Sequence, residues 1–131
     1  MTKITGILID VKKQTIERCI VECDNSNKTF YELLNCRTIS CPTRMIEGIK
    51  VIVVCDDEGL LKDDPLPAII GISERTGGIV DIIAGSVFLC KFDGVDDITS
   101  LSEKEIERIL SAVHVVSDGK NDFRVLCSTF R

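Results

Sequence analysis

The most constraining feature of this sequence is the run at residues 49–55, IKVIVVC, which is apolar on both alternating sets of positions. Successive side chains of an extended strand point to opposite faces of a sheet. One face of this strand would carry Ile, Val, Val and Cys, and the other would carry Ile52 and Val54. Such a strand is covered on both faces. The rest of the chain must therefore supply a layer for each side.

Other runs rich in β-branched and apolar residues predict the strands that accompany it. They cover residues 4–11, 16–23, 68–73, 79–83, 87–92, 114–116 and 123–127. Residues 37–46 form a further extended piece, kept irregular by Pro42, which has no N–H for a sheet ladder. The glycine turn at 74–78 predicts a hairpin between the runs on either side of it.

Two segments have the spacing of a capping box, in which a hydroxyl and a carboxylate each satisfy a free backbone amide at a helix start. Ser102 with Glu105 opens an amphipathic segment and predicts a helix over residues 102–113. Thr29 with Glu32 predicts a shorter helix, which Asn35 would end in the left-handed conformation.

Together these elements predict an α+β fold in one domain over residues 1–131, a length that one core can serve. We expect a mixed, mainly antiparallel sheet of about five to seven strands. The helix in the C-terminal half is expected to pack on a face of this sheet. Residues 114–131 are expected to form a C-terminal hairpin added to the domain.

Cysteine usage and hydropathy bear on the compartment. No run of about 18 apolar residues is present, so no membrane association is expected. The apolar run at residues 7–9 is too short for a signal peptide, which predicts a cytoplasmic protein. The seven cysteines are odd in number and form no CxxC pair, which fits reduced thiols. No metal site and no cofactor are expected.

Acidic residues are concentrated in the middle of the chain. Residues 56–110 carry 13 acidic and 5 basic side chains, which argues against a nucleic-acid partner. The acidic cluster Asp56, Asp57, Glu58 and Asp93 has the hard oxygen ligands that divalent cations prefer. One alternative is therefore a small metal-dependent hydrolase, although the preferred interpretation of these residues is that they are solvated acids of ordinary turns. No residue is assigned a catalytic role.

Candidate anion ligands lie elsewhere. The turn containing Arg75, Gly77 and Gly78 could present backbone amides and a guanidinium to a phosphate. Arg37 and Arg44 flank the Cys41-Pro42 pair in the irregular extended piece. If the three arginines converge, they frame an anion site; if they scatter, they only support the fold.

Four ordered motifs resemble one family: LLNC at 33–36, CDDEGLLK at 55–62, GSVFLCKFDG at 85–94 and TSLSEKEIERI at 99–109. They are similar to small phage and mobile-element proteins of unknown function from Firmicutes and gut bacteria. The resemblance implies an accessory protein in the cytoplasm of a bacterial host. It supplies no established catalytic residues.

The resulting hypothesis is a non-catalytic protein that antagonises a bacterial defence by binding a host protein or a small nucleotide signal. Capture of a protein would need an exposed apolar or acidic patch. Capture of a nucleotide would need a pocket with arginines near an aromatic ring such as Phe30, Tyr31 or Phe92. A homo-oligomer formed through a strand edge or a helix face stays open.

Overall fold

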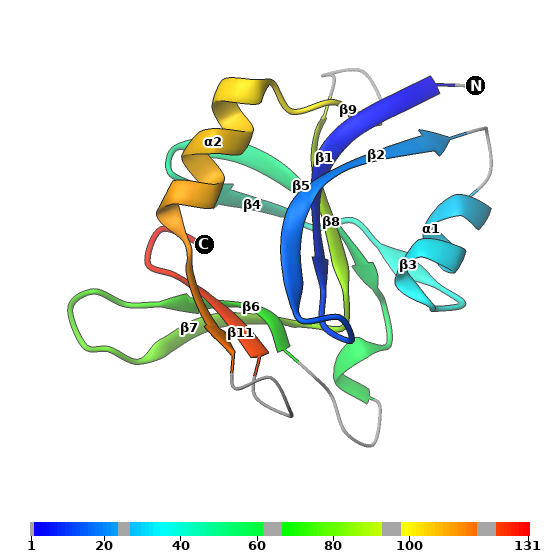
Figure 1. Ribbon diagram of the computed structural model, residues 1–131. Helices are drawn as coiled ribbons and strands as arrows, with labels where there is room; N and C mark the ends of the chain where they lie inside the picture. The colour runs from blue at the N-terminus through cyan, green and yellow to red at the C-terminus, as the bar shows by residue number, and fades with distance from the viewer. Residues whose placement is uncertain (1, 24–26, 62–66, 93–97, 118–122) are drawn as a thin grey trace.

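A computed structural model of the chain describes residues 2–23, 27–61, 67–92, 98–117 and 123–131. These residues form two β-sheets, two α-helices and a short 3₁₀ turn (Figure 1). The larger sheet contains β1 (Thr2–Asp10), β2 (Thr15–Cys23), β3 (Ile39–Ser40), β4 (Thr43–Ile46), β5 (Ile49–Asp56), β8 (Val87–Phe92) and β9 (Ile98–Thr99). The smaller sheet contains β6 (Pro67–Ile72), β7 (Ile79–Ala84), β10 (His114–Ser117) and β11 (Phe123–Cys127). The remaining elements are α1 (Lys28–Leu34), α2 (Glu103–Ala112) and η1 (Gly59–Leu61).

The larger sheet is built outward from β5. Its strand order is β2-β1-β8-β5-β3, with β4 also paired to β5 and β9 to β8, and all its pairings are antiparallel. Every residue of β5 except Lys50 is buried. Its odd-numbered apolar residues enter one core and Ile52 and Val54 enter the other. Coverage of this strand on both faces is confirmed.

The mainly antiparallel α+β architecture is confirmed, but the prediction of one sheet is wrong. The hairpin β6–β7 forms as expected. Strand β6 also pairs in parallel with a second neighbour, β11. The four strands β10-β11-β6-β7 then form a second sheet. The second sheet is needed to cover the apolar face of the larger sheet, because α2 is only ten residues long. One such helix is too short to shield the apolar face of β1, β8 and β5, and the second sheet supplies the rest.

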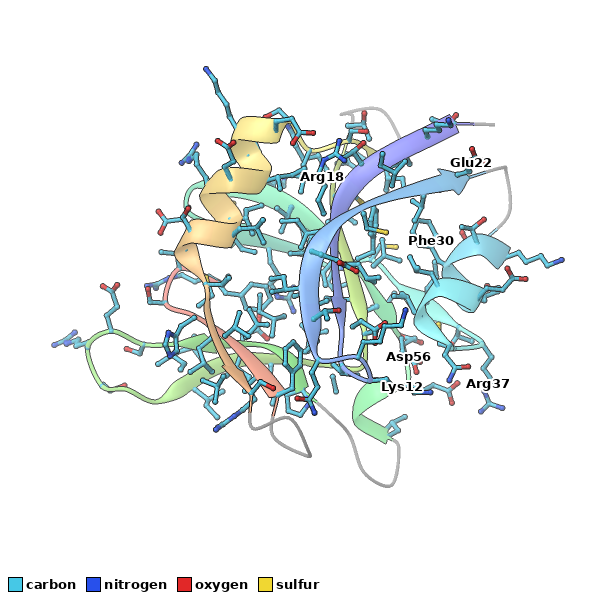
Figure 2. The ribbon with its side chains drawn as sticks, viewed as in Figure 1. Lys12, Arg18, Glu22, Phe30, Arg37 and Asp56 are labelled. Carbon is cyan, nitrogen blue, oxygen red and sulfur yellow. The ribbon has the colours of Figure 1, made fainter. Side chains whose placement is uncertain are left out.

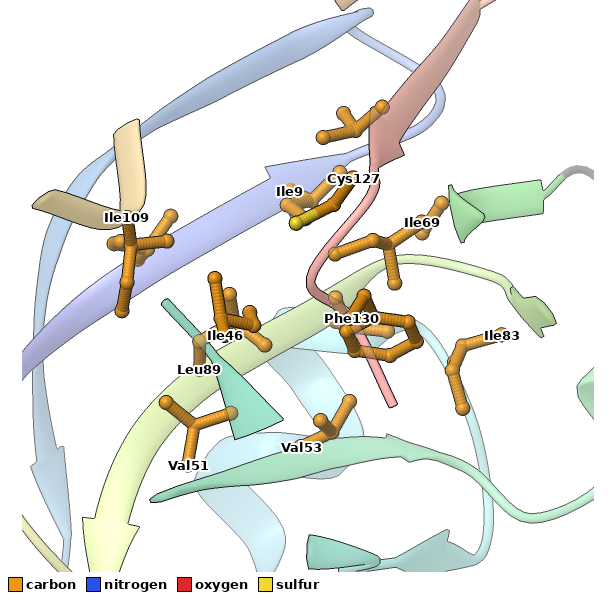
Figure 3. Packing of buried hydrophobic residues seen from close by; sticks show 14 of the residues in the cluster. Ile9, Ile46, Val51, Val53, Ile69, Ile83, Leu89, Ile109, Cys127 and Phe130 are labelled. Carbon is orange, nitrogen blue, oxygen red and sulfur yellow. The ribbon is translucent and has the colours of Figure 1, made fainter. Parts of the chain in front are cut away.

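The main core lies between the two sheets and α2 (Figure 3). Its fully buried side chains come from both sheets, from α2 and from the C-terminal tail: Ile7, Ile9, Ile46, Val51, Val53, Ala68, Ile69, Val87, Leu89, Ile109, Val125 and Phe130. A second core lies on the opposite face of the larger sheet, where Phe30 and Leu34 of α1 pack. The rings of Phe30 and Phe88 are 5.8 Å apart there.

Helix α2 begins as the sequence predicts. Ser102 accepts a hydrogen bond from the backbone N–H of Glu105, and the Glu105 carboxylate accepts one from the backbone N–H of Ser102. Ile106 and Ile109 are its buried residues. In the parts of the chain that the structure describes, no helix is long and apolar enough to cross a membrane.

Helix α1 begins differently from the prediction. It starts at Lys28, so Thr29 already lies inside it, and no side chain caps its N-terminus. The Thr29 hydroxyl instead donates to the carbonyl oxygen of Glu22, 3.0 Å away on β2. The capping box predicted at Thr29 is therefore wrong, because that hydroxyl joins the helix to the sheet. The left-handed end at Asn35 is confirmed by its φ of 52°.

The C-terminal tail joins the two sheets. It leaves β11, and Arg131 then exchanges two backbone hydrogen bonds of 3.1 Å with Met45 on β4. Phe130, which lies between β11 and Arg131 in the sequence, is fully buried in the main core. Gly71 of β6 lies so close to the tail that an added Cβ would be 2.5 Å from the Phe130 carbonyl oxygen. The segment expected as an added hairpin thus contributes β11 and this tail to the packing of both sheets.

We predict that Phe130→Ala lowers the free energy of unfolding by about 3–5 kcal/mol, because it removes a fully buried ring and leaves a cavity. The matched control is Phe92→Ala, whose ring is 45% exposed and whose loss should cost about 1 kcal/mol or less. Urea denaturation followed by circular dichroism measures both variants. Equal losses would contradict a joining role for the tail.

Candidate functional site

Arg37 and Glu58 form a two-pronged ion pair at one end of the larger sheet. Arg37 follows α1 and Glu58 follows β5, and Nε and Nη2 of the arginine donate to Oε1 and Oε2 of the glutamate at 2.9 and 3.0 Å. The Thr38 hydroxyl also lies 3.3 Å from Glu58 Oε1. The hydrogen bond to Glu58 raises the pKa of the Arg37 guanidinium. The Arg37 side chain is 84% exposed, so water screens this pair.

The acidic cluster is divided by burial. Asp56 ends β5 and is buried, and its Oδ1 accepts a 2.9 Å hydrogen bond from the Glu58 backbone N–H, whereas Asp57 is exposed. Figure 2 labels Asp56 and Arg37 at the same end of the molecule. Within the described ranges, no three His, Cys, Asp or Glu side chains are grouped to hold a metal ion. Asp93 lies outside those ranges.

Arg44 and Asp81 form a more protected ion pair between the sheets. Arg44 Nε on β4 is 2.6 Å from Asp81 Oδ2 on β7, and the two side chains are only 27% and 22% exposed. The guanidinium also donates to the Thr43 carbonyl oxygen. The other carboxylate oxygen, Oδ1, accepts from the Ile82 backbone N–H at 2.9 Å. The pair therefore holds an edge of the larger sheet against β7.

The turn between β6 and β7 uses its own backbone amides. The Ser73 hydroxyl accepts from the N–H groups of Arg75 and Thr76, and the Ser73 carbonyl accepts from that of Gly77. The Gly78 N–H donates to the Thr76 hydroxyl. Gly77 has a φ of +73°, which favours glycine. Four successive amides that could have bound an anion are thus engaged within the turn.

The structure does not bring the three arginines together. Arg37 lies beside α1, while the β6–β7 turn that contains Arg75 projects from the opposite side of the molecule (Figures 1 and 2). Arg44 lies on β4 and binds Asp81. Among the described residues of the acidic cluster, Glu58 is the one that pairs with a candidate arginine, Arg37. Two of the three candidate arginines are therefore in ion pairs with carboxylates from different elements.

Four of the cysteine thiols have a pKa that burial raises, as is typical of structural cysteines. Burial raises the pKa of Cys90 to about 12 and that of Cys55 to about 11. Burial also raises the pKa of Cys41, although this residue is exposed, and that of Cys19. A raised pKa keeps a thiol neutral near pH 7 and weakens it as a nucleophile.

Two surface features have no counterpart in the sequence interpretation. Ile79 and Val80 on β7 are 65% and 57% exposed, although their run is typical of an ordinary half-buried strand. A shallow groove of about 630 Å³ lies along α2, lined by Lys104, Glu107, Arg108, Ser111 and Ala112 with Glu47. Arg108 Nη2 donates to the Glu47 carbonyl oxygen at 2.6 Å beside it. Both features depend on long-range packing, so local periodicity gave no signal for them.

Fold and site together define a small two-sheet α+β domain in which Arg37 and Arg44, two of the candidate anion ligands, pair with carboxylates of the domain itself. A family model described as a domain of unknown function, DUF3846, matches residues 4–114, and the chain belongs to this family. No curated protein matches the chain. No solved structure matches it either.

We predict that a double-mutant cycle on Arg44→Gln and Asp81→Asn gives a coupling of about 1–2 kcal/mol in urea denaturation, because this pair is mostly shielded from water. The comparison cycle uses Arg37→Gln and Glu58→Gln. Its coupling should be smaller and should vanish in high salt, since Arg37 is exposed. A larger coupling for the Arg37 pair would contradict the assignment of Arg44 as the inter-sheet contact.

Glu105 makes a pH-dependent contribution to stability. Desolvation acts to raise its pKa, but hydrogen bonds from the Ser102 backbone and from Lys91 outweigh this and lower the pKa below its ordinary value of 4.5. A depressed carboxyl pKa stabilises the fold fully above the ordinary pKa, and that stabilisation is lost as the pH falls through the folded value.

We therefore predict that Glu105→Gln has a lower urea midpoint than the unmodified chain at pH 7, and that this difference closes as the pH falls to about 3. Glutamine can still accept a hydrogen bond at this capping position, so the variant isolates the charge. Glu107→Gln, on the exposed side of α2, is the control. A difference that is unchanged between pH 7 and low pH would refute the role of the charge.

Proposed function

We propose that this chain is a non-catalytic binding protein of phage or mobile-element origin that antagonises a bacterial defence in the host cytoplasm. We propose further that it captures a host defence protein. The resemblance of its ordered motifs supports the first part. The exposed apolar side chains on the β6–β7 hairpin support the second.

The observation that carries protein capture is the exposure of Ile79 and Val80. These neighbouring β-branched side chains are 65% and 57% exposed on a hairpin that projects from the body of the molecule (Figure 1). Exposed apolar side chains on a projecting element are typical of protein-binding surfaces. Arg75 is exposed in the adjoining turn and adds a positive charge to the rim. Protein interfaces combine exposed apolar side chains with charged residues around them, and both kinds are present on this hairpin.

Nucleotide capture is the less favoured form of the same proposal. It needs arginines beside an accessible aromatic ring, but Phe30 is buried against Phe88 and Arg37 is paired with Glu58. Tyr31 is half-buried on the short helix α1. These contacts favour a partner that recognises apolar surface over one that recognises charge and base stacking.

The test is expression of the chain in bacteria that carry individual defence systems, followed by phage plating. We predict that the chain restores plating on at least one such host by about tenfold or more, and that Ile79→Asp with Val80→Asp abolishes this effect. Val115→Asp, at the opposite edge of the same sheet, is the matched control and should keep the effect. Circular dichroism of each purified variant verifies folding.

Affinity purification from the protected host identifies the partner. A stoichiometric host defence protein that is lost with the double variant supports the proposal. A nucleotide that co-purifies and is retained by the double variant overturns protein capture in favour of nucleotide capture. If the chain restores plating on none of the hosts, the proposed role against bacterial defence is overturned.

A further inference from the structure

Strand β2 forms an outer edge of the larger sheet. It pairs with β1 over its full nine residues, and among the described residues no strand pairs with its other side. The Glu22 carbonyl accepts a hydrogen bond from the Thr29 hydroxyl, so this carbonyl points away from β1. The N–H and C=O of one strand residue point the same way and alternate along the strand. Glu22, Ile20, Arg18 and Ile16 therefore present their backbone groups at the open edge.

The side chains of three of these residues form an ordered pattern on one face of the sheet. Arg18 is a cation, Ile20 is an apolar side chain with 51% exposure, and Glu22 is an anion. Figure 2 labels Arg18 beside α2 and Glu22 near the C-terminal end of β2. The order is antisymmetric about Ile20, with opposite charges two residues away on each side. Such a pattern is complementary to a reversed copy of itself.

We propose that the partner of this edge is a second copy of the chain, joined by antiparallel pairing of β2 with β2 about a two-fold axis at Ile20. In this register Ile20 lies opposite Ile20 of the second copy. Arg18 then lies opposite the second copy's Glu22, and the two-fold axis repeats this pair. Arg18, Ile20 and Glu22 all present their backbone N–H and C=O toward the second copy. The register that pairs their side chains therefore also allows the backbone hydrogen bonds of an antiparallel ladder.

The charges select this register over its neighbours. With the axis at Cys19, Arg18 would face an isoleucine and Glu22 would also face an isoleucine. With the axis at Arg18, two arginines would face each other. Opposite charges directly across a strand pair stabilise it, and like charges destabilise it. The axis at Ile20 gives two attractive pairs and an apolar contact at the centre.

The side chains needed for this pairing have capacity left for it. Arg18 binds Glu103 of α2 through Nε and Nη2, and a guanidinium carries five N–H donors. The Glu22 contact to Lys3 is long, at 3.7 Å, and both side chains are exposed. Carbonyl oxygens accept two hydrogen bonds, so the bond from Thr29 leaves Glu22 able to accept another.

Sedimentation velocity from about 1 µM to about 1 mM tests the association. We predict a monomer–dimer equilibrium, weakened about tenfold by Glu22→Arg, which places an arginine opposite Arg18. Arg18→Glu combined with Glu22→Arg restores the pairing and should recover most of the affinity. Glu32→Arg, an exposed charge reversal on α1, is the matched control and should leave the equilibrium unchanged.

Arg18→Glu also removes the ion pair with Glu103, so the double variant changes more than the proposed interface. Disulfide trapping tests the same register without that variant. The Ile20→Cys variant should form an intermolecular disulfide under mild oxidation, mapped by mass spectrometry to the introduced thiol in both copies. In the unmodified chain, a Cys19–Cys19 crosslink would place the axis at the wrong residue and overturn the register. A monomer at every concentration, or equal weakening by Glu22→Arg and Glu32→Arg, overturns the proposal. A host protein strand that binds this edge of a monomer also overturns it.

Discussion

The structure depends on one constraint, the burial of the central strands on both faces. Val51 and Val53 point into the main core and Ile52 and Val54 into the second, so β5 cannot serve as the surface of any layer. Phe88 and Leu89 divide β8 between the same two cores. A sheet with such a centre needs cover on two sides. The smaller sheet with α2 supplies one cover, and α1 supplies part of the other.

Gly6 shows how tightly the central strands are fitted. A Cβ at this position of β1 would be 2.1 Å from the Leu89 carbonyl oxygen and 2.7 Å from the Phe88 ring. A glycine inside a strand commonly marks such a close approach. The ring of Phe88 can therefore lie over β1 and meet Phe30 of α1. The packing of the second core thus rests on a residue whose contribution is the absence of a side chain.

Local patterns predicted the elements but not their partners. The alternation in β5, the capping box at Ser102 and the left-handed end at Asn35 are each set within a few neighbouring residues. The pairing of Val125 with Ile69 joins segments that are far apart in the sequence, and hydrophobic periodicity carries no information about such a choice. Thr29 failed as a cap for the same reason, since its hydroxyl is used by a residue on another element.

In the candidate site too, local sequence predicts the chemistry of a residue but not its long-range partner. Arg37, Arg44 and Arg75 have the right chemistry for an anion, but the pairing of Arg44 with Asp81 depends on how β4 and β7 meet across the two sheets. The Ser73 hydroxyl, by contrast, is a local signal, because serine commonly accepts hydrogen bonds from amides two and three residues ahead in a turn. This signal was not used in the prediction of an anion site at the turn, and it argues against that prediction because it engages the amides of Arg75 and Thr76.

The sheet edges differ in how they are closed, and this difference bears on association. On β7, the Ile82 N–H is occupied by Asp81, which Arg44 holds in place. On β4, Met45 exchanges both of its backbone hydrogen bonds with Arg131. Exposed strand edges invite pairing with other chains, and proteins usually block them with such devices. The edge of β2 instead carries a cation, an apolar residue and an anion in sequence, the arrangement on which the proposed pairing with a reversed copy depends.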